Sequence, residues 1–377
     1  MAKLFIVVNE DRFFLSHRLP VALAAKEKGY DVTVITKDTG QKSEVVNKGF
    51  RFIDMPINPT GMNPIEEGKT FHFLFNLYNR EKPDIVHHVG LKDILWGSMA
   101  AKMAKIKGVV NAYSGLGGLF NGDKISTTAA GILKLLKFTN SKNKVKTIFQ
   151  NNDDLEIMLA HKVVLPEQVY FTKGSGIDLE EFIYSEPPES DKIQIIFTGR
   201  LVKEKGVYDL IEAANILKGE YQDKIKFILC GRLTPNKSGV NEDYLKLNCD
   251  GNYISWLGER NDIKRLLKNS HIMVFPSYYR EGIPKSLIEA CAIGRPIVTC
   301  NSVGCKDVVE DGKNGILIPP KNPVVLAAAI KKLINDEALR SKMGKCAREK
   351  AEREFSISRV IETHLEIYDS LIKDKNK

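Results

Sequence analysis

The chain alternates along its whole length between short runs of β-branched residues and longer segments with helical periodicity. Strands that alternate with helices form βαβ units, and right-handed crossovers then cover both faces of a parallel sheet with helices. We therefore predict an α/β protein of the doubly wound, Rossmann-like type. The first seven predicted strands are Leu4–Val8, Val32–Thr36, Arg51–Ile57, Ile85–Val89, Val109–Tyr113, Thr147–Gln150 and Val169–Thr172.

A polar stretch, Tyr184–Lys192, interrupts the alternation. Its two prolines favour exposed, extended backbone, so we interpret it as a linker. The length of 377 residues also exceeds the size at which single cores stop growing, about 250–300 residues. The sequence therefore predicts two Rossmann-like domains, 1–183 and 184–357, with an interdomain cleft and a C-terminal helix, about 358–377, that packs back on the first. The strands of the second domain are Ile193–Thr198, Ile225–Cys230, Ile254–Leu257, Ile272–Pro276, Pro296–Cys300 and Gly315–Ile318.

Composition excludes several protein classes. Apolar residues make up 43% of the chain and charged residues 27%, which is typical of globular and not of disordered proteins. No run approaches the roughly 20 apolar residues that cross a bilayer, and the apolar start, Lys3–Val8, is too short for a signal peptide. The six cysteines form no CxxC pair, which favours reduced thiols over disulfides or a zinc site. We therefore expect a cytoplasmic protein.

The net charge of +9 is concentrated in the first half. Residues 1–175 hold 24 basic and 17 acidic side chains, hence +7, and the remainder holds 32 and 30, hence +2. This excess could attract phosphates, anionic lipid head groups or nucleic acid, or it could be a solvated surface. The aromatic residues are not interleaved with the basic clusters as base stacking would need, so no nucleic-acid partner is expected.

The strongest local pattern is Glu281-Gly-Ile-Pro-Lys-Ser-Leu-Ile-Glu289, which follows a predicted strand and an aromatic loop. Pro284 suits the first turn of a helix, and the N–H groups of that turn would form an anion site. Glu281 in the loop and Glu289 in the helix offer two carboxylates for hydroxyl groups. The alternative is a loop acid and a surface helix acid with no shared role. The N–H groups in question belong to Lys285, Ser286 and Leu287.

A second pattern, Phe197-Thr-Gly-Arg-Leu-Val-Lys-Glu-Lys-Gly206, contains the first strand end of the second domain. Arg200 and Lys205 bracket the loop at the carboxyl end of this strand, and Gly206 begins the next helix. A planar guanidinium and a compact ammonium together suit a diphosphate. The alternative is a solvated basic loop.

These two segments together resemble the family-4 retaining glycosyltransferases of the GT-B fold. The family's Glu-x7-Glu signature matches Glu281 and Glu289, and its Gly-Arg-x4-Lys-Gly loop begins at Gly199. The segment Ile254–Asp262 resembles the strand and loop that flank the nucleotide base. Asn301–Val309 resembles the segment after the motif helix, where many members have a glycine followed by an acid. The resemblance covers nearly the whole chain and is more specific in the second half.

The resemblance implies a role for each matching residue. Arg200 and Lys205 would bind the diphosphate of a UDP-sugar, Glu289 the ribose hydroxyls and Glu281 the sugar hydroxyls. No Asp-x-Asp occurs in the sequence, and fixed cations with helix N–H groups can stabilise a departing diphosphate. We therefore expect no metal and no other cofactor, and we predict activity in the presence of a chelator. The remaining donor-binding positions would be Gly199, Gly258, Gly282, Ile283, Pro284, Ser286 and Leu287.

The first domain is expected to bind the acceptor. Phe13–Pro20 resembles the start of bacterial polysaccharide and N-glycan-assembly transferases that extend a lipid-diphosphate-linked sugar. This resemblance puts His17 and Arg18 at the cleft, with His17 as a catalytic candidate; the alternative is that His17 only packs at a helix terminus. Many relatives have a glycine-rich loop where this chain has Asn9–Arg12, which removes the basis for donor-phosphate contacts there.

Other polar residues of the first domain have structural alternatives. Ser114–Gly118 resembles a glycine loop of the same subgroup, but a tight turn explains it equally well. His87 and His88 lie in a strand, where one must face each way, and Lys92 would reach the cleft. Gly174–Asp178 resembles the family's crossing between domains, which is a structural role.

Five lysines follow or interleave the apolar residues of the segment 132–138. A basic amphipathic helix can lie on an anionic membrane, where each lysine contributes roughly 1 kcal/mol. This would suit a lipid-linked acceptor at the cytoplasmic face of the inner membrane. The alternative is a core-packed helix with a wet basic face. The lysines are Lys134, Lys137, Lys142, Lys144 and Lys146.

The sequence thus predicts a retaining glycosyltransferase that moves a hexose or N-acetylhexosamine from a UDP-sugar to a glycan on polyprenyl diphosphate, in bacterial cell-surface polysaccharide or glycoconjugate synthesis. The retaining outcome is what the resemblance implies, and no residue is an obvious covalent nucleophile. The family resemblance also implies front-face attack, with the donor phosphate taking the acceptor proton. The alternatives are a UDP-sugar epimerase on the same scaffold and a basic nucleic-acid-binding protein.

Overall fold

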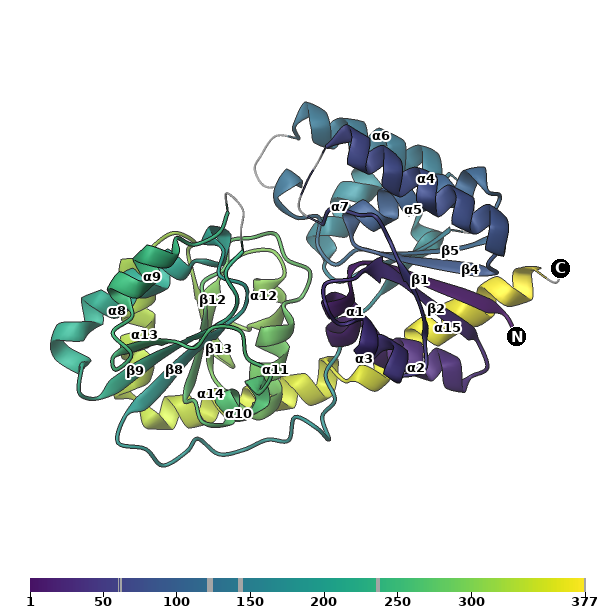
Figure 1. Ribbon diagram of the computed structural model, residues 1–377. Coiled ribbons are helices and arrows are strands. Elements are labelled where there is room, and N and C mark those ends of the chain that lie inside the picture. The colour runs from purple at the N-terminus through teal and green to yellow at the C-terminus, as the bar shows by residue number, and fades with distance from the viewer. Residues whose placement is uncertain (60, 62, 121–124, 142–144, 235–237, 376–377) are drawn as a thin grey trace. The chain divides into compact units, whose positions relative to one another are not determined.

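The computed structural model describes residues 1–59, 61, 63–120, 125–141, 145–234 and 238–375, and the chain divides into two compact units. Unit 1 comprises Met1–Gly176 and Ile357–Lys377, and unit 2 comprises Ile177–Ser356. The chain therefore leaves unit 1 before the boundary at residue 183 that the sequence favours. Each unit holds one parallel sheet with helices on both faces (Figure 1). This confirms the predicted α/β class of two doubly wound domains.

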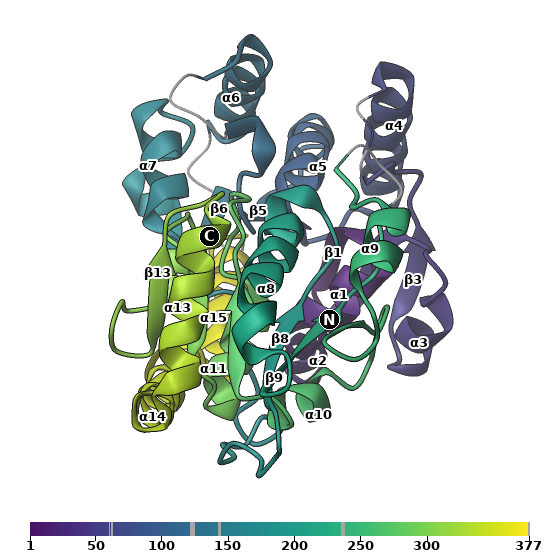
Figure 2. The same ribbon diagram turned by 90° about the vertical axis from the view of Figure 1, so that its left-hand side faces the viewer.

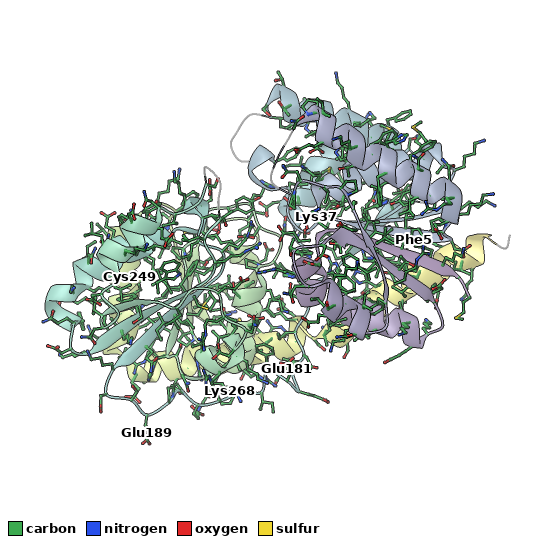
Figure 3. The ribbon with its side chains drawn as sticks, viewed as in Figure 1. Phe5, Lys37, Glu181, Glu189, Cys249 and Lys268 are labelled. Carbon is green, nitrogen blue, oxygen red and sulfur yellow. The ribbon has the colours of Figure 1, made fainter. Side chains whose placement is uncertain are left out.

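Unit 1 is built on a seven-stranded sheet with the order β3-β2-β1-β4-β5-β6-β7. Successive residues of β1 enter different cores, since Ile6 packs in one cluster with Val21 and Tyr368, whereas Phe5, labelled in Figure 3, packs in another with Leu74 and Ala100. The strands are β1 (Lys3–Glu10), β2 (Asp31–Lys37), β3 (Arg51–Asp54), β4 (Ile85–Val89), β5 (Gly108–Ala112), β6 (Val145–Phe149) and β7 (Val169–Phe171). The helices are α1 (Asp11–His17), α2 (Leu19–Glu27), α3 (Lys42–Asn47), α4 (Pro64–Glu81), α5 (Leu91–Met103), α6 (Thr127–Thr139), α7 (Asn152–Ala160) and α15 (Ile357–Lys375).

Unit 2 is built on a six-stranded sheet with the order β10-β9-β8-β11-β12-β13. Helices α8 and α13 lie side by side on one face (Figure 2), and α10, α11 and α14 pack on the other. The strands are β8 (Ile193–Thr198), β9 (Ile225–Cys230), β10 (Ile254–Trp256), β11 (Ile272–Phe275), β12 (Ile297–Cys300) and β13 (Gly315–Ile318). The helices are α8 (Val207–Tyr221), α9 (Glu242–Asn248), α10 (Ile263–Lys268), α11 (Lys285–Ile293), α12 (Cys305–Val308), α13 (Pro323–Asn335) and α14 (Glu337–Glu354).

Every strand predicted from the sequence is present, and the differences have local causes. Strand β3 ends at Asp54 instead of Ile57, since Pro56 has no N–H with which to continue the ladder. The predicted linker lies inside unit 2, where the buried guanidinium of Arg295 donates to the carbonyl oxygen of Ser185 at 2.8 Å. The helical C-terminus is divided at residues 355–356, where the chain returns to unit 1.

Candidate functional site

The sheet of unit 2 reverses its winding direction between the neighbouring strands β8 and β11. Ligands of doubly wound sheets bind beside the carboxyl ends of the strands at such a switch point. The loop after β8, residues 199–206, carries the Gly-Arg-x4-Lys-Gly pattern, and the loop after β11 carries Glu281. The topology therefore brings both sequence patterns to one edge of one sheet.

Lys205 and Glu281 form an ion pair at this edge. Nζ of Lys205 lies 3.0 Å from Oε1 of Glu281, and the two side chains are only 12% and 15% exposed. The same ammonium lies 4.8 Å from the centre of the Phe275 ring, within cation–π range. The hydroxyl of the fully buried Ser277 donates to Glu281 at 3.4 Å. The lysine thus contacts a carboxylate and an aromatic face, and it is largely removed from water.

Backbone contacts fix the two loops to each other. The carbonyl oxygen of Glu204 accepts hydrogen bonds from the N–H groups of Tyr278 at 2.9 Å and Tyr279 at 3.1 Å. Gly206, with φ of 71°, begins α8, and a Cβ at this position would lie 2.2 Å from the carbonyl oxygen of Pro276. The separation of Lys205 and Glu281 is therefore set by main-chain packing and not by the two side chains alone.

The other predicted residues of the β8 edge lie at the ends of adjacent strands. Arg200 is exposed on the loop that carries Lys205. The N–H of Gly199 donates to the carbonyl oxygen of Cys230 at 2.9 Å. Gly258 follows β10 with φ of 68° and accepts a hydrogen bond from the N–H of Gly231 at 2.8 Å. The carboxyl ends of β8, β9 and β10 therefore form one continuous edge, with an exposed cation on it.

Helix α11 departs in part from the predicted anion site. Pro284, predicted in the first helical turn, is instead the N-cap residue, in extended conformation and with no side-chain cap. In addition, the N–H of Leu287 donates to the carbonyl oxygen of Pro284 at 3.1 Å, and its side chain is fully buried. Leu287 is therefore engaged within the helix. Ser286 is partly exposed, whereas Gly282 and Ile283 are buried beside the Glu281 loop.

Glu289 lies in the middle of α11 and is 13% exposed. Burial raises the pKa of this carboxyl group, and Lys285, whose Nζ is 3.8 Å away, lowers it only in part. A largely buried carboxylate has lost hydration that the hydroxyl groups of a ligand can replace. The environment of Glu289 therefore suits a partner that donates hydrogen bonds.

All six cysteines are free thiols, as the sequence predicts. Four are buried, whereas Cys249, directly after α9 (Figure 3), and Cys346 are partly exposed. Over the part of the chain that the structure describes, no three His, Cys, Asp or Glu residues are grouped to hold a metal ion.

In unit 1, His17 is the last residue of α1 and Arg18 follows it. Nδ1 of His17 lies 2.6 Å from Oγ of Ser16, and its ring stacks on Phe13 with centroids 4.2 Å apart. Arg18, predicted to face a cleft, is instead only 2% exposed, and burial lowers its pKa to about 10. The prediction for Arg18 is wrong because its side chain turns into the core, near Tyr368 of α15.

His87 and His88 are fully buried on opposite faces of β4, which confirms their alternation. Nδ1 of His87 lies 2.7 Å from the hydroxyl of Tyr368, and Nε2 of His88 lies 3.0 Å from that of Tyr78. Burial lowers the pKa of both imidazoles, to about 4 for His88. They are neutral core residues and cannot contact a substrate.

Lys92, predicted to reach the cleft, is tied to its own unit. Its Nζ lies 2.6 Å from Glu67 and 2.7 Å from the carbonyl oxygen of Asn58. These bonds attach the first turn of α5 to the first turn of α4 and to the segment before it. A hydrogen bond holds the glycine loop Ser114–Gly118 in place, because the N–H of Leu116 donates to the buried Asp154 at 3.2 Å.

The sequence analysis missed the role of Asp11. This buried carboxylate accepts hydrogen bonds from the N–H groups of Arg12 at 2.7 Å, Thr39 at 2.7 Å and Gln41 at 3.0 Å, and also from the Thr39 hydroxyl. Asp11 thus joins the loops after β1 and β2. An acid directly after a strand was the signal, but its partners lie one βα unit further along the chain.

The helix predicted to bind membrane is α6. Leu133 and Leu136 are buried, whereas Lys134 and Lys137 are exposed and Phe138 is 56% exposed. Two of the five lysines, Lys142 and Lys144, lie outside the described residues. Lys146 belongs to β6 and not to the helix. No helix within the described ranges is both long and apolar enough to cross a membrane.

Two family models match the chain. Residues 3–152 match the model described as glycosyl transferase 4-like, and residues 178–350 match the model described as glycosyl transferases group 1. The N,N'-diacetylbacillosaminyl-diphospho-undecaprenol alpha-1,3-N-acetylgalactosaminyltransferase of Campylobacter jejuni is 29% identical over 96% of this chain and 99% of its own length. The UDP-Gal:alpha-D-GlcNAc-diphosphoundecaprenol alpha-1,3-galactosyltransferase of Escherichia coli is 27% identical over 92% of this chain and 90% of its own length.

Solved structures share the fold. A glycosyltransferase from Rickettsia africae has a TM-score of 0.77 at 19% identity, covering 99% of both chains. HepE from Anabaena, solved in complex with UDP, has a TM-score of 0.78 at 17% identity, covering 98% of this chain and 100% of its own.

Together, the two doubly wound sheets and these matches define an enzyme of the GT-B fold that transfers sugars. Each unit thus matches a glycosyltransferase model, the N-terminal part the glycosyl transferase 4-like model and the C-terminal part the group 1 model. The predicted family resemblance and enzyme class are thereby confirmed.

Proposed function

We propose that unit 2 binds a UDP-sugar and that unit 1 binds a glycan carried on polyprenyl diphosphate, to which a hexose or N-acetylhexosamine is transferred with retention of configuration. The observation that carries the proposal is the Lys205–Glu281 pair at the switch point of unit 2, on the same edge as the start of α11. The printed names of the Campylobacter and Escherichia relatives, which contain undecaprenyl-diphosphate-linked sugars, support this acceptor class.

The chemistry needs positive charge beside the leaving group. Breaking the bond between sugar and phosphate leaves negative charge on UDP, and Lys205, with Arg200 and the first turn of α11, would stabilise it. Lys205 is effective because it is poorly hydrated, with Glu281 and Phe275 around it. Loss of one such donor typically costs about 10²–10³ in rate.

The carboxylates would hold the neutral parts of the donor. Glu289 would accept hydrogen bonds from ribose hydroxyls and Glu281 from sugar hydroxyls. The edge around Gly199 and Gly258 would accommodate the nucleoside. Gly282, Ile283, Pro284 and Ser286 would shape the backbone beside the sugar and phosphates, while His17 would act on the acceptor from unit 1.

We also propose that α6 contacts anionic lipid at the cytoplasmic face of the membrane that holds the acceptor. Its exposed Lys134, Lys137 and Phe138 present charge and apolar surface together. Sedimentation at low salt with anionic vesicles, but not with neutral vesicles, is the expected result. A Lys134→Glu/Lys137→Glu variant that sediments as well as the unmodified protein would contradict it.

The donor assignment is tested by following UDP release from UDP-glucose, UDP-galactose and their N-acetyl counterparts, with and without a polyprenyl-diphosphate-linked acceptor. Arg200→Ala and Glu289→Ala should lose about 10²-fold or more in rate, while Lys203→Ala, an exposed lysine of the same loop, should retain it. Full turnover by either of the first two variants would overturn the assignment. Conversion of a UDP-sugar into its epimer without acceptor would favour an epimerase instead.

A further inference from the structure

The loop between β12 and α12 packs directly on the loop that carries Glu281, with no side chain between them. Gly304 has φ of 84°, and a Cβ at this position would lie 1.7 Å from the carbonyl oxygen of Gly282 and 2.9 Å from that of Glu281. Carbon–oxygen contacts are about 3.3–3.6 Å even where a C–H group donates to the oxygen. Any side chain at residue 304 would therefore displace one of the two loops by more than about 1 Å.

The two loops are also hydrogen-bonded to each other near their starts. The hydroxyl of Ser302 donates to the carbonyl oxygen of Ser277 at 2.7 Å. The N–H of Gly304 donates to Asp307 at 3.1 Å, inside the same short segment. A clash at Gly304 would therefore act directly on the backbone of Glu281 and Gly282, whose carbonyl groups lie against it.

We propose that Gly304 is a positioning residue for the sugar end of the donor site. This inference rests on the proposed function, in which Glu281 and Gly282 meet the hexose or N-acetylhexosamine ring of the donor. Gly304 acts only through these two residues, because its own contacts are with their carbonyl groups. The UDP end depends on other groups, Glu289 in α11 for the ribose and Arg200 after β8 for the diphosphate. A shift of about 1 Å at a reacting centre can cost about 10²-fold in rate.

The test compares Gly304→Ala with Gly312→Ala. Gly312 also has positive φ, 75°, but a Cβ there would meet nothing within 4 Å, so it reproduces the backbone strain without the clash. The affinity for UDP is measured by calorimetry. The values of kcat and KM are measured with whichever UDP-sugar the unmodified protein turns over. Gly304→Ala should bind UDP within about threefold of the unmodified protein yet lose about 10²-fold in kcat/KM. Gly312→Ala should keep both values and lose only some thermal stability.

A second variant keeps the inference testable if Gly304→Ala does not fold. Ser302→Ala adds no atoms and removes the bond that joins the β12–α12 loop to the Glu281 loop, so it should lower kcat/KM about five- to tenfold with UDP affinity unchanged. Equal losses of UDP affinity and turnover in these variants, or no loss in either, would overturn the inference. An unmodified protein that neither binds UDP nor turns over any UDP-sugar would overturn the proposed function, and the role of Gly304 with it.

Discussion

Replacing Glu281 with glutamine should strengthen the binding of UDP, the product that carries no sugar. In the free protein the ammonium of Lys205 is already paired with Glu281, at 3.0 Å, so a phosphate must compete with a carboxylate for it. Glutamine keeps the size of the side chain and a hydrogen-bond acceptor but removes the charge. Lys205 then becomes available to the diphosphate at a smaller cost.

The geometry of the pair bounds the size of the effect. At 3.0 Å and an effective dielectric constant of about 20, the Coulomb attraction is about 5.5 kcal/mol, which is an upper limit. Exposed pairs contribute about 0–1 kcal/mol in practice, and this pair lies above them because both side chains are largely buried. We take about 1–2 kcal/mol, which corresponds to a fall of about 5- to 30-fold in the Kd for UDP.

The matched control is the second carboxylate of the pattern. Glu289→Gln should weaken UDP binding, since ribose hydroxyls donate more strongly to a carboxylate than to an amide. Titration calorimetry on the unmodified protein and both variants, at one ionic strength, shows whether each substitution raises or lowers the affinity for UDP. Turnover of the UDP-sugar should fall in both variants. If Glu281→Gln binds UDP as weakly as the unmodified protein, or more weakly, then Lys205 is not shared between Glu281 and the diphosphate.

Acidification should destabilise unit 1, because burial and the Arg18 guanidinium lower the pKa of His364 to about 3, whereas the unfolded imidazole is protonated near pH 6.5. The stability that this histidine contributes is complete above pH 6.5 and is lost as the pH falls towards 3, and at pH 5 the loss is about 2 kcal/mol. In urea unfolding, the free energy of unfolding of His364→Gln should therefore change less between pH 6.5 and pH 5 than that of the unmodified protein. Asp11→Asn should lower the free energy of unfolding by about 2–3 kcal/mol, as a drop in Tm, since an amide cannot accept all four hydrogen bonds; an unchanged Tm would refute its role as a link between loops. Transfer should proceed at the same rate in EDTA, and a loss of rate that only a divalent ion restores would contradict the assignment of Lys205 and Arg200.

The fold could be predicted because the chain repeats one local rule. Alternating β-branched runs and helical segments leave few topologies once crossovers are right-handed, so all thirteen strands could be predicted. Two motifs placed directly after strands also predicted that Lys205 and Glu281 would lie at one sheet edge. The sequence could not predict that the two side chains form an ion pair, since such a contact between distant loops depends on the register of β8 and β11.

The failures come from contacts made late in the chain. Arg18 and His17 are neighbours at a helix terminus, and nothing local indicates which of them turns inward. Arg18 is buried because α15 returns from the far end of the chain and covers it with Tyr368 and His364. The requirement for glycine at residue 304 also depends on a contact distant in sequence. A side chain there would clash with the carbonyl oxygen of Gly282, whose position is set by the packing of two separate loops.

The pairing of Lys205 with Glu281 bears on the release of UDP. In the proposed site the same carboxylate neutralises Lys205 when the site is empty and accepts sugar hydroxyls when the donor is bound. When a UDP-sugar binds, its diphosphate separates the ion pair at a cost in free energy, and the hydrogen bonds from its sugar to Glu281 offset that cost. UDP alone also separates the ion pair, but it has no sugar hydroxyl groups to donate to Glu281, so the cost is not offset. Glu281 thus favours substrate over product by the free energy of the ion pair, and its return to Lys205 would help to displace UDP once the sugar has gone.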